Sequence, residues 1–119
     1  MYVASTNPHI YSSSAGGVVV DPSEDDILAS TDAQPRGRYA CSVILATEAL
    51  ATSMAQFAVH HRDATDEYDI ETVVVTVPTD DSRQFELGFT LKPDERVTVT
   101  PFVEVSGNVV ATIVWQRAV

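Results

Sequence analysis

His60 and His61 are the residues of this 119-residue chain whose types and spacing come nearest to a reactive site. They precede Arg62 and Asp63, and a histidine beside a carboxylate can act as a general base. The apolar alternation before them predicts a strand, in which adjacent side chains point to opposite faces. The two histidines therefore cannot hold one metal ion together, and no nucleophile is signalled nearby. The simpler interpretation is a strand end with one histidine packed and the other exposed.

A cluster of acids follows, formed by Asp63, Asp66, Glu67 and Asp69. Carboxylates at this spacing could supply some of the six to eight oxygen ligands that calcium takes. The spacing matches no calcium loop, however, and the glycine that such a loop uses to turn is missing. We therefore interpret the cluster as a solvated turn, and we interpret the acidic run at residues 21–26 in the same way.

The other reactive or aromatic residues also favour ordinary roles. Cys41 is the single cysteine, so an intrachain disulfide is impossible, and its apolar surroundings predict a core residue. Tyr39 and Trp115 lie in predicted strands and are expected to fill the core. Gly16-Gly17 is not followed by the residues of a phosphate loop. We accordingly predict no catalytic residue, no metal and no cofactor, and we do not expect an enzyme.

The charge of the chain limits its partners. Asp and Glu number 17 against 7 Lys and Arg, which gives a formal net charge of −10. Nucleic acids and anionic membranes attract clustered basic residues, so neither is an expected partner. No apolar run approaches the roughly 18 residues that a membrane span needs, and the N-terminus lacks the pattern of a secretion signal. We expect a soluble protein that folds in a cytoplasm.

Period-two alternation dominates the second half of the chain and is clearest in Phe85–Leu91, where every second residue is large and apolar. Such alternation predicts strands with one buried face. Turn-forming residues separate these runs at short intervals, which is typical of a sandwich or jelly roll. We also expect a tight hairpin at Ser106-Gly107-Asn108, because Gly and Asn tolerate positive φ. The predicted strands cover residues 39–45, 54–62, 73–77, 85–91, 96–105 and 109–115.

Two regions fit this pattern less well. Residues 1–36 have loop compositions interrupted by short apolar runs, and we interpret them as an N-terminal arm with entry strands, ahead of a sandwich domain at 37–119. Residues 46–56 suit either an amphipathic helix or a loop leading into a strand at Met54–Arg62, and we favour the second.

The faces of the predicted strands differ in polarity. Gln84, Glu86, Thr90, Thr98 and Thr100 should form a solvated second face. Three valines instead place apolar groups on faces that should be wet: Val74, Val110 and Val114. Strands that are apolar on both sides imply a second covering layer. This layer would be the N-terminal arm or a neighbouring subunit.

The region 38–117 resembles small all-β accessory proteins of tailed bacteriophages, of the kind that decorate or cement the capsid. The resemblance lies in Phe57–Ala64, in Phe85–Phe89, in Glu95–Val99 and in the ending Gly107–Arg117. It implies an antiparallel β-sandwich, jelly-roll-like, that acts as a non-enzymatic virion component assembled in the host cytoplasm. It further implies a homo-oligomer, with a trimer favoured, that binds the major capsid protein or another virion protein.

Three alternatives to capsid decoration remain open. One is a tail or neck component. Another is a carbohydrate- or receptor-binding β-sandwich module, which would be marked by an exposed row of aromatic rings or a calcium-lined loop. The third is an enzyme, which would need a cleft that holds His60 or His61 beside convergent acids. Tyr2 and Tyr11 fall in the irregular N-terminal region, so the sequence does not indicate such a row.

Overall fold

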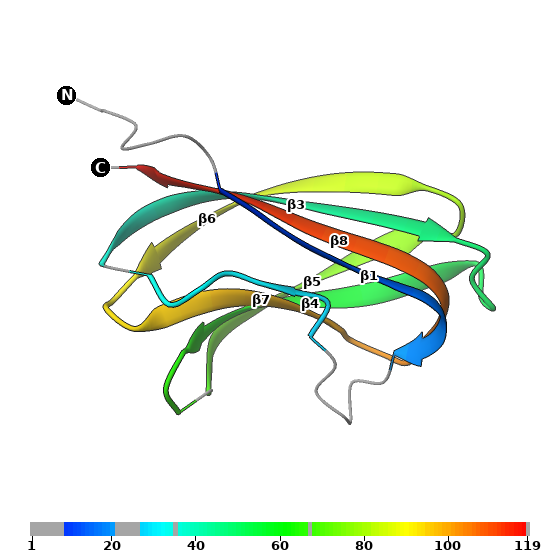
Figure 1. The fold of residues 1–119 in the computed structure, drawn as a ribbon, viewed down its shortest axis with the longest axis horizontal. Helices are drawn as coiled ribbons and strands as arrows, with labels where there is room; N and C mark the ends of the chain where they lie inside the picture. The colour runs from blue at the N-terminus through cyan, green and yellow to red at the C-terminus, as the bar shows by residue number, and fades with distance from the viewer. Residues whose placement is uncertain (1–8, 21–26, 35, 67, 119) are drawn as a thin grey trace.

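Eight antiparallel strands form two stacked sheets in the part of the chain that the computed structural model describes, which is residues 9–20, 27–34, 36–66 and 68–118 (Figure 1). Sheet A has the strand order β1-β8-β3-β6 and sheet B the order β2-β7-β4-β5. Successive strands thus alternate between sheets for most of the chain, which is jelly-roll topology. The predicted fold class is confirmed. The strands are β1 (His9–Val20), β2 (Ala29–Ser30), β3 (Gly37–Glu48), β4 (Met54–Asp63), β5 (Asp69–Pro78), β6 (Ser82–Leu91), β7 (Glu95–Pro101) and β8 (Val105–Ala118).

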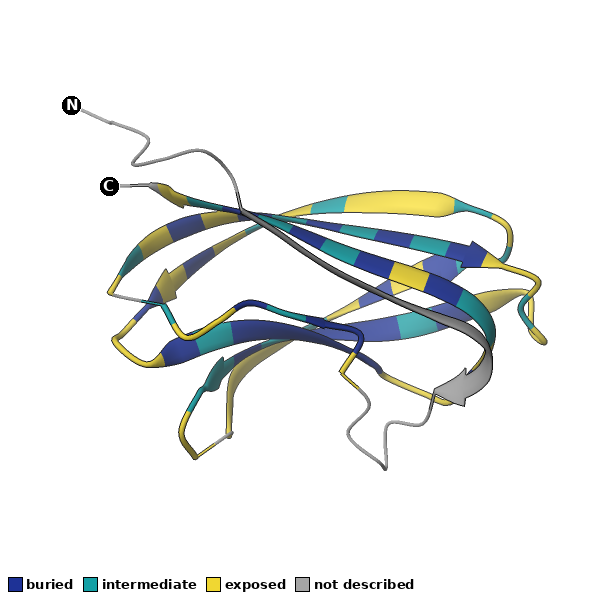
Figure 2. Cartoon of the chain, viewed as in Figure 1, coloured by how far each residue is buried: buried dark blue, intermediate teal, exposed yellow. Residues whose placement is uncertain are grey.

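The core lies between the sheets and is built by the period-two alternation of their strands. Along β3, Tyr39, Cys41, Val43 and Leu45 are buried while the residues between them are partly or fully exposed. Figure 2 shows the same banding along strands of both sheets. Tyr39 stacks on Trp115 of β8, with ring centroids 4.5 Å apart. The core positions predicted for Tyr39, Cys41 and Trp115 are therefore confirmed.

Burial also decides the chemistry of Cys41. Desolvation, with a smaller contribution from the charge of Glu86, raises the pKa of its thiol to about 12. The thiolate is the reactive form of cysteine, so this side chain is unsuited to act as a nucleophile at neutral pH.

Residues 46–56 enter β4 without a helix. Strand β3 continues to Glu48, a short irregular segment follows, and β4 begins at Met54. The favoured interpretation of this region is confirmed. No helix in the described ranges has the length and apolar composition needed to span a membrane.

The hairpin expected at Ser106-Gly107-Asn108 is wrong, because these residues lie inside β8. The chain turns earlier, at residues 102–104, between β7 and β8. Gly107 has φ of 140°, and a Cβ added to it would lie 2.8 Å from the carbonyl oxygen of Ala49. The glycine is therefore required by a close backbone approach within a strand, which is the other common reason for Gly in that setting.

The prediction of a polar second face holds for β6 and fails for β7. Gln84, Glu86 and Thr90 are exposed on β6. Thr98 and Thr100 are buried on β7, because this strand lies between β2 and β4 and the His60 ring covers Thr100. Sequence alternation identified the face correctly but could not show that neighbouring side chains would cover it.

Within residues 1–36, the twelve-residue strand β1 pairs with β8, with an irregularity between Ala15 and Val18, and β2 pairs with β7. The domain boundary at residue 36 stays a prediction. The acidic run 21–26 and Tyr2 lie outside the described residues. Val74 and Val110 are exposed on the outer faces of sheets B and A, and Val114 is half-buried. No covering layer over Val74 or Val110 is present in the described part of the chain.

Candidate functional site

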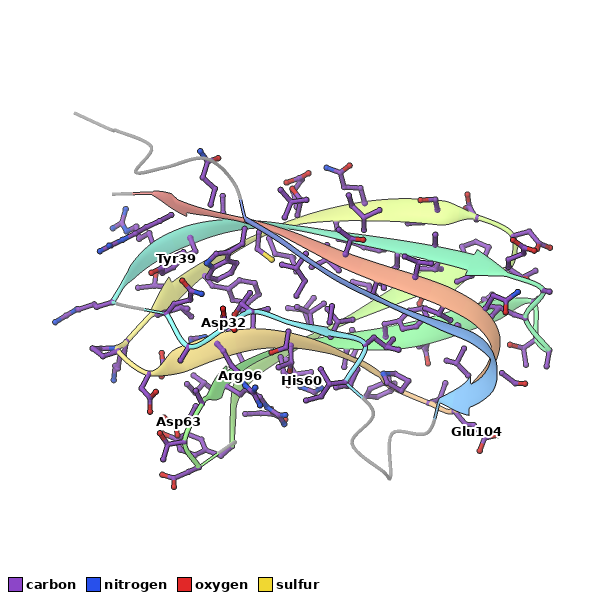
Figure 3. The ribbon with its side chains drawn as sticks, in the orientation of Figure 1. Asp32, Tyr39, His60, Asp63, Arg96 and Glu104 are labelled. Atoms are coloured by element: carbon purple, nitrogen blue, oxygen red, sulfur yellow. The ribbon has the colours of Figure 1, made fainter. Side chains whose placement is uncertain are left out.

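His60 and His61 point to opposite faces of β4, and each lines a different depression of the surface. His61 points inward and is buried. His60, which is labelled in Figure 3, is half-buried on the outer face of sheet B. The sequence-based expectation of one packed histidine is confirmed, but the expectation that the other is exposed is wrong. His60 is held by hydrogen bonds to its neighbours on β5 and β7.

The larger depression lies at the side of the sandwich where β5 and β6 are the last strands of their sheets. We call it the edge pocket, and its volume is about 400 Å³. Side chains of three kinds meet in it: an exposed aromatic ring, apolar and hydroxyl groups, and charged or titratable groups. The lining residues are His61, Tyr68, Ile70, Thr90, Lys92 and Glu95.

A buried polar pair forms the floor of the edge pocket. His61 Nε2 lies 2.9 Å from Glu95 Oε1, and both side chains are almost fully buried. The same oxygen of Glu95 accepts a hydrogen bond from the backbone N–H of Lys92 at 2.7 Å. The other ring nitrogen of His61 lies 3.4 Å from a carboxylate oxygen of Glu71, which is exposed. These contacts fix the orientation of both His61 and Glu95.

Aromatic packing adds to this fixation. The Phe89 ring of β6 contacts the His61 ring edge-on, with centroids 5.9 Å apart. Since Phe89 belongs to sheet A and His61 to sheet B, the contact joins the two sheets beneath the pocket. The polar floor is therefore supported by the core.

The wall of the edge pocket is the loop between β4 and β5, which carries Tyr68. The Tyr68 ring is 57% exposed, while its backbone carbonyl accepts a hydrogen bond from the N–H of Asp63. The Asp63 carboxylate accepts bonds from the N–H groups of Thr65 and Asp66, which is the geometry of an Asx turn. Tyr68 thus presents an exposed ring on a loop whose backbone is held by hydrogen bonds.

The neighbouring loop, between β6 and β7, is joined to this wall. Ala64 donates a backbone hydrogen bond to the carbonyl of Asp94 at 2.8 Å, and the Thr65 hydroxyl bonds the Asp94 carboxylate. Asp94 has φ of 66°, a conformation that aspartate tolerates better than most residues. The two loops hold each other in place beside the pocket.

The smaller depression, of about 190 Å³, lies on the outer face of sheet B and is called the outer-face depression. His60 Nε2 forms a hydrogen bond of 2.9 Å with the Thr100 hydroxyl, and His60 Nδ1 lies 3.3 Å from a carboxylate oxygen of Asp69. Asp69 also accepts two bonds from the Arg62 guanidinium, at 3.0 and 3.1 Å. Phe102 lies at its margin and is 49% exposed. Its polar groups are largely engaged with one another.

The acids proposed as calcium ligands do not converge. Asp63 bonds backbone N–H groups, Asp69 bonds Arg62 and His60, and Glu67 lies outside the described residues. Across the residues that the structure describes, no three His, Cys, Asp or Glu side chains are placed to share one metal ion.

Sequence reasoning found His61 but missed Tyr68, Lys92 and Glu95 as its companions. Tyr68 carried a usable signal, since an aromatic residue between two acids in a predicted turn has no core to enter. Lys92 and Glu95 follow a different strand and carried no local signal. Only the pairing of distant strands brings them to His61.

No family model matches this chain, and no curated protein matches it by sequence. Solved structures do match its fold. A xylan-binding domain of carbohydrate-binding module family 22 aligns over 75% of this chain with a TM-score of 0.55 and 16% identity. The chain spans 64% of that domain, which is less than two thirds of its length.

Two further structures match over nearly their whole length. Eiger TNF from S. frugiperda aligns over 94% of this chain and 93% of its own, with a TM-score of 0.59 and 11% identity. The globular domain of zebrafish complement 1qA aligns over 94% and 97%, with a TM-score of 0.53 and 11% identity. At these identities the matches establish the jelly-roll sandwich and nothing finer.

Proposed function

We propose that this protein is a non-catalytic β-sandwich module that binds carbohydrate in the edge pocket. The observation that carries the proposal is the exposed Tyr68 ring, which lines the same pocket as the fixed His61–Glu95 pair. Sugars present apolar C–H faces and a rim of hydroxyl groups. A flat ring suits the first, and oriented donors and acceptors suit the second.

The dimensions of the edge pocket support a small organic ligand. Its volume of about 400 Å³ falls within the range of ordinary ligand sites. Its lining combines Ile70 and Tyr68, both exposed, with the polar groups of Thr90, Lys92 and Glu95. Such a mixture of apolar surface and a few fixed polar groups is what orients a ligand in a pocket.

The polar groups support binding rather than catalysis. Glycoside hydrolysis needs two carboxyl groups facing each other across the scissile bond, one of them an acid. Glu95 instead directs one oxygen at both His61 and the Lys92 amide, so its bonds hold the floor of the pocket together. The likeness in fold to a xylan-binding domain is compatible with this proposal and supplies the first polysaccharide to test.

Isothermal titration calorimetry with soluble xylan, and with other soluble polysaccharides, tests the proposal. The substitution Tyr68→Ala should weaken binding about tenfold, which corresponds to a loss of about 1.4 kcal/mol of binding free energy from stacking. The matched control is Phe102→Ala, which removes a similarly exposed ring at the outer-face depression and should leave binding unchanged. Absence of binding to every saccharide, or equal losses from both variants, would refute the proposal.

A second candidate is a phage structural protein, such as a capsid decoration protein bound to the major capsid protein. The observation that favours it is the exposure of Val74 and Val110, apolar groups on surfaces that a partner could cover. None of the solved structures named above is a phage protein, so this candidate rests on the sequence resemblance and on these valines. Mass spectrometry of phage particles produced by the strain that carries the gene should detect the chain if it is a virion component.

A further inference from the structure

The outer face of sheet A is free of charge over the middle of its two central strands. From Tyr39 to Thr47 on β3, and from Val105 to Gln116 on β8, the sequence contains no Asp, Glu, Lys or Arg. The neighbouring strand β1 contains none either. Charged residues make up 20% of the whole chain, so an extended uncharged region of sheet is unusual for this protein.

The side chains that β3 and β8 direct outward here are small or apolar. We call this surface the neutral face, formed by Ala40, Ser42, Ile44, Val110, Thr112 and Val114. Val110 is 44% exposed, Ala40 is exposed, and the other four are half-buried. The register aligns them in adjacent rows, since Ser42 pairs with Val114 and Ile44 with Thr112. The result is a low, uncharged surface without a large protruding side chain.

We propose that the neutral face packs against a second copy of this chain. The charge distribution selects this occupant. Apart from Glu86 at the rim of this face, most of the acids that would attract a basic partner lie in the loops and on sheet B, for example at Asp63, Asp69 and Asp81. A charged partner would find no counter-charge on the neutral face, and placing its charges there would remove them from water without compensation.

The net charge of −10 restricts how two copies can meet. Like-charged molecules repel, so association is least unfavourable where both surfaces carry the fewest charges. The neutral face meets this condition. At its rim, the Glu86 carboxylate on β6 accepts a 2.6 Å hydrogen bond from Ser42, which anchors the acid beside the uncharged centre.

The shape of the neutral face also suits a second sheet. Sheets stack face to face at about 10 Å when their side chains interdigitate. The small residues Ala40 and Ser42, together with Gly88 opposite Ala40 on β6, leave shallow space for the side chains of a partner. Val110 and Val114 supply apolar surface to bury. This inference is independent of carbohydrate binding, because the edge pocket lies at the side of the sandwich.

Sedimentation velocity of the purified protein over a range of concentrations tests the proposal. The wild type should sediment as an oligomer, and Val110→Lys and Ala40→Glu should each shift it to the monomer. Both positions are exposed in the single chain, so neither variant places a charge in the core. Far-UV circular dichroism and melting curves confirm that the variants are folded. If one variant fails to fold, the other carries the test.

Val74→Lys is the matched control, because Val74 is a similarly exposed valine, at 42%, on the outer face of sheet B. It should leave the oligomer intact. Adding salt to the wild type should increase the oligomeric fraction, since screening weakens repulsion between acidic copies. The proposal is overturned if the wild type is monomeric at every concentration, or if Val74→Lys dissociates the oligomer while the two neutral-face variants do not.

Discussion

The two sheets of this sandwich share one core and differ sharply in their outer faces. Sheet A presents the neutral face, with small and apolar side chains and no charge at its centre. Sheet B presents His60, Arg62 and Asp69 in a network of ion pairs and hydrogen bonds. Arg62 also lies directly opposite Arg96 on β7. The fold does not require this difference, because strand alternation asks only that the inner faces be apolar.

The comparison teaches that the outer faces carry the information about function. Inner residues such as Val43 of sheet A and Val59 of sheet B are chemically alike and equally buried. They explain why the chain folds and say little about what it binds. The edge pocket is the exception, because its floor includes the inward-pointing His61, while the rest of its lining lies where β5 and β6 are the last strands of their sheets.

The largest expected effects come from the shared core, where the two sheets should behave alike. Phe57→Ala in sheet B should lower the free energy of unfolding by about 3–5 kcal/mol, and Ile113→Ala in sheet A by about 2–5 kcal/mol. Both side chains are completely buried. Denaturant unfolding measures the losses. A small loss in one sheet would show that the core is not shared equally.

The two histidines of β4 sharpen the contrast between inside and outside. Glu95→Ala should cost about 2–4 kcal/mol, because it leaves the buried His61 Nε2 without its acceptor, at about 1–3 kcal/mol, and removes the partly buried hydrogen bond from the Lys92 amide, at about 1 kcal/mol. His60→Ala should cost only about 0.5–1.5 kcal/mol, because the Thr72 hydroxyl is exposed and removal of the ring uncovers the Thr100 hydroxyl, so that water can replace both lost hydrogen bonds. Equal losses in urea unfolding would contradict the different burial of the two sites.

Two glycines of sheet A differ in how closely other atoms approach them, and replacing each by alanine tests that difference. Gly107→Ala should destabilise the protein by about 1–3 kcal/mol, because φ of 140° is strained for alanine and its Cβ would meet Ala49 and Leu50. Gly88→Ala is the control, since its Cβ would lie 3.9 Å from the nearest atom and needs no unusual φ. Thermal melting should separate the two variants. A normal melting temperature for Gly107→Ala would show that the loop moves aside.

The smallest effect concerns Glu86, the acid at the rim of the neutral face. Hydrogen bonds from Ser42 and Gln84 lower the pKa of its carboxyl group. Their contribution to stability is therefore present above the usual pKa of glutamate and is lost as the pH falls through the lowered value. Ser42→Ala should move the pKa of Glu86 back toward its usual value, as followed by NMR titration. An unchanged pKa would show that Ser42 does not bond this carboxylate in solution.

The sequence predicts the fold well because one rule, alternation, governs most of it. The inward positions of Tyr39, Cys41 and Trp115 follow from their spacing alone. Alternation could not predict the burial of Thr98 and Thr100, which depends on the strands that flank β7 and, for Thr100, on the His60 ring. The reason for a glycine at position 107 was equally out of reach, because it is a close approach to Ala49 and Leu50, which are distant in the sequence.

The candidate site is less predictable for the same reason. Its floor joins His61 of β4 with Glu95 at the start of β7, which are 34 positions apart in the chain. Strand register decides that they meet, and register is a property of the whole sheet. Tyr68 was within reach of prediction, since its acidic surroundings leave it no place in a core.

The position of His60 and His61 on one central strand limits which insertions and deletions strand β4 can accept. Strand β4 is bordered by β5 on one side and β7 on the other. Inserting or deleting a single amino acid between Phe57 and His60 would exchange the inward-facing and outward-facing positions that follow it in β4. The His61 imidazole would then leave the floor of the edge pocket, and the His60 imidazole would point inward. A change of two amino acids would preserve the parity. Insertions or deletions of an odd number of residues should therefore be tolerated in the loops but not within β4, where they would reverse the face to which each histidine points.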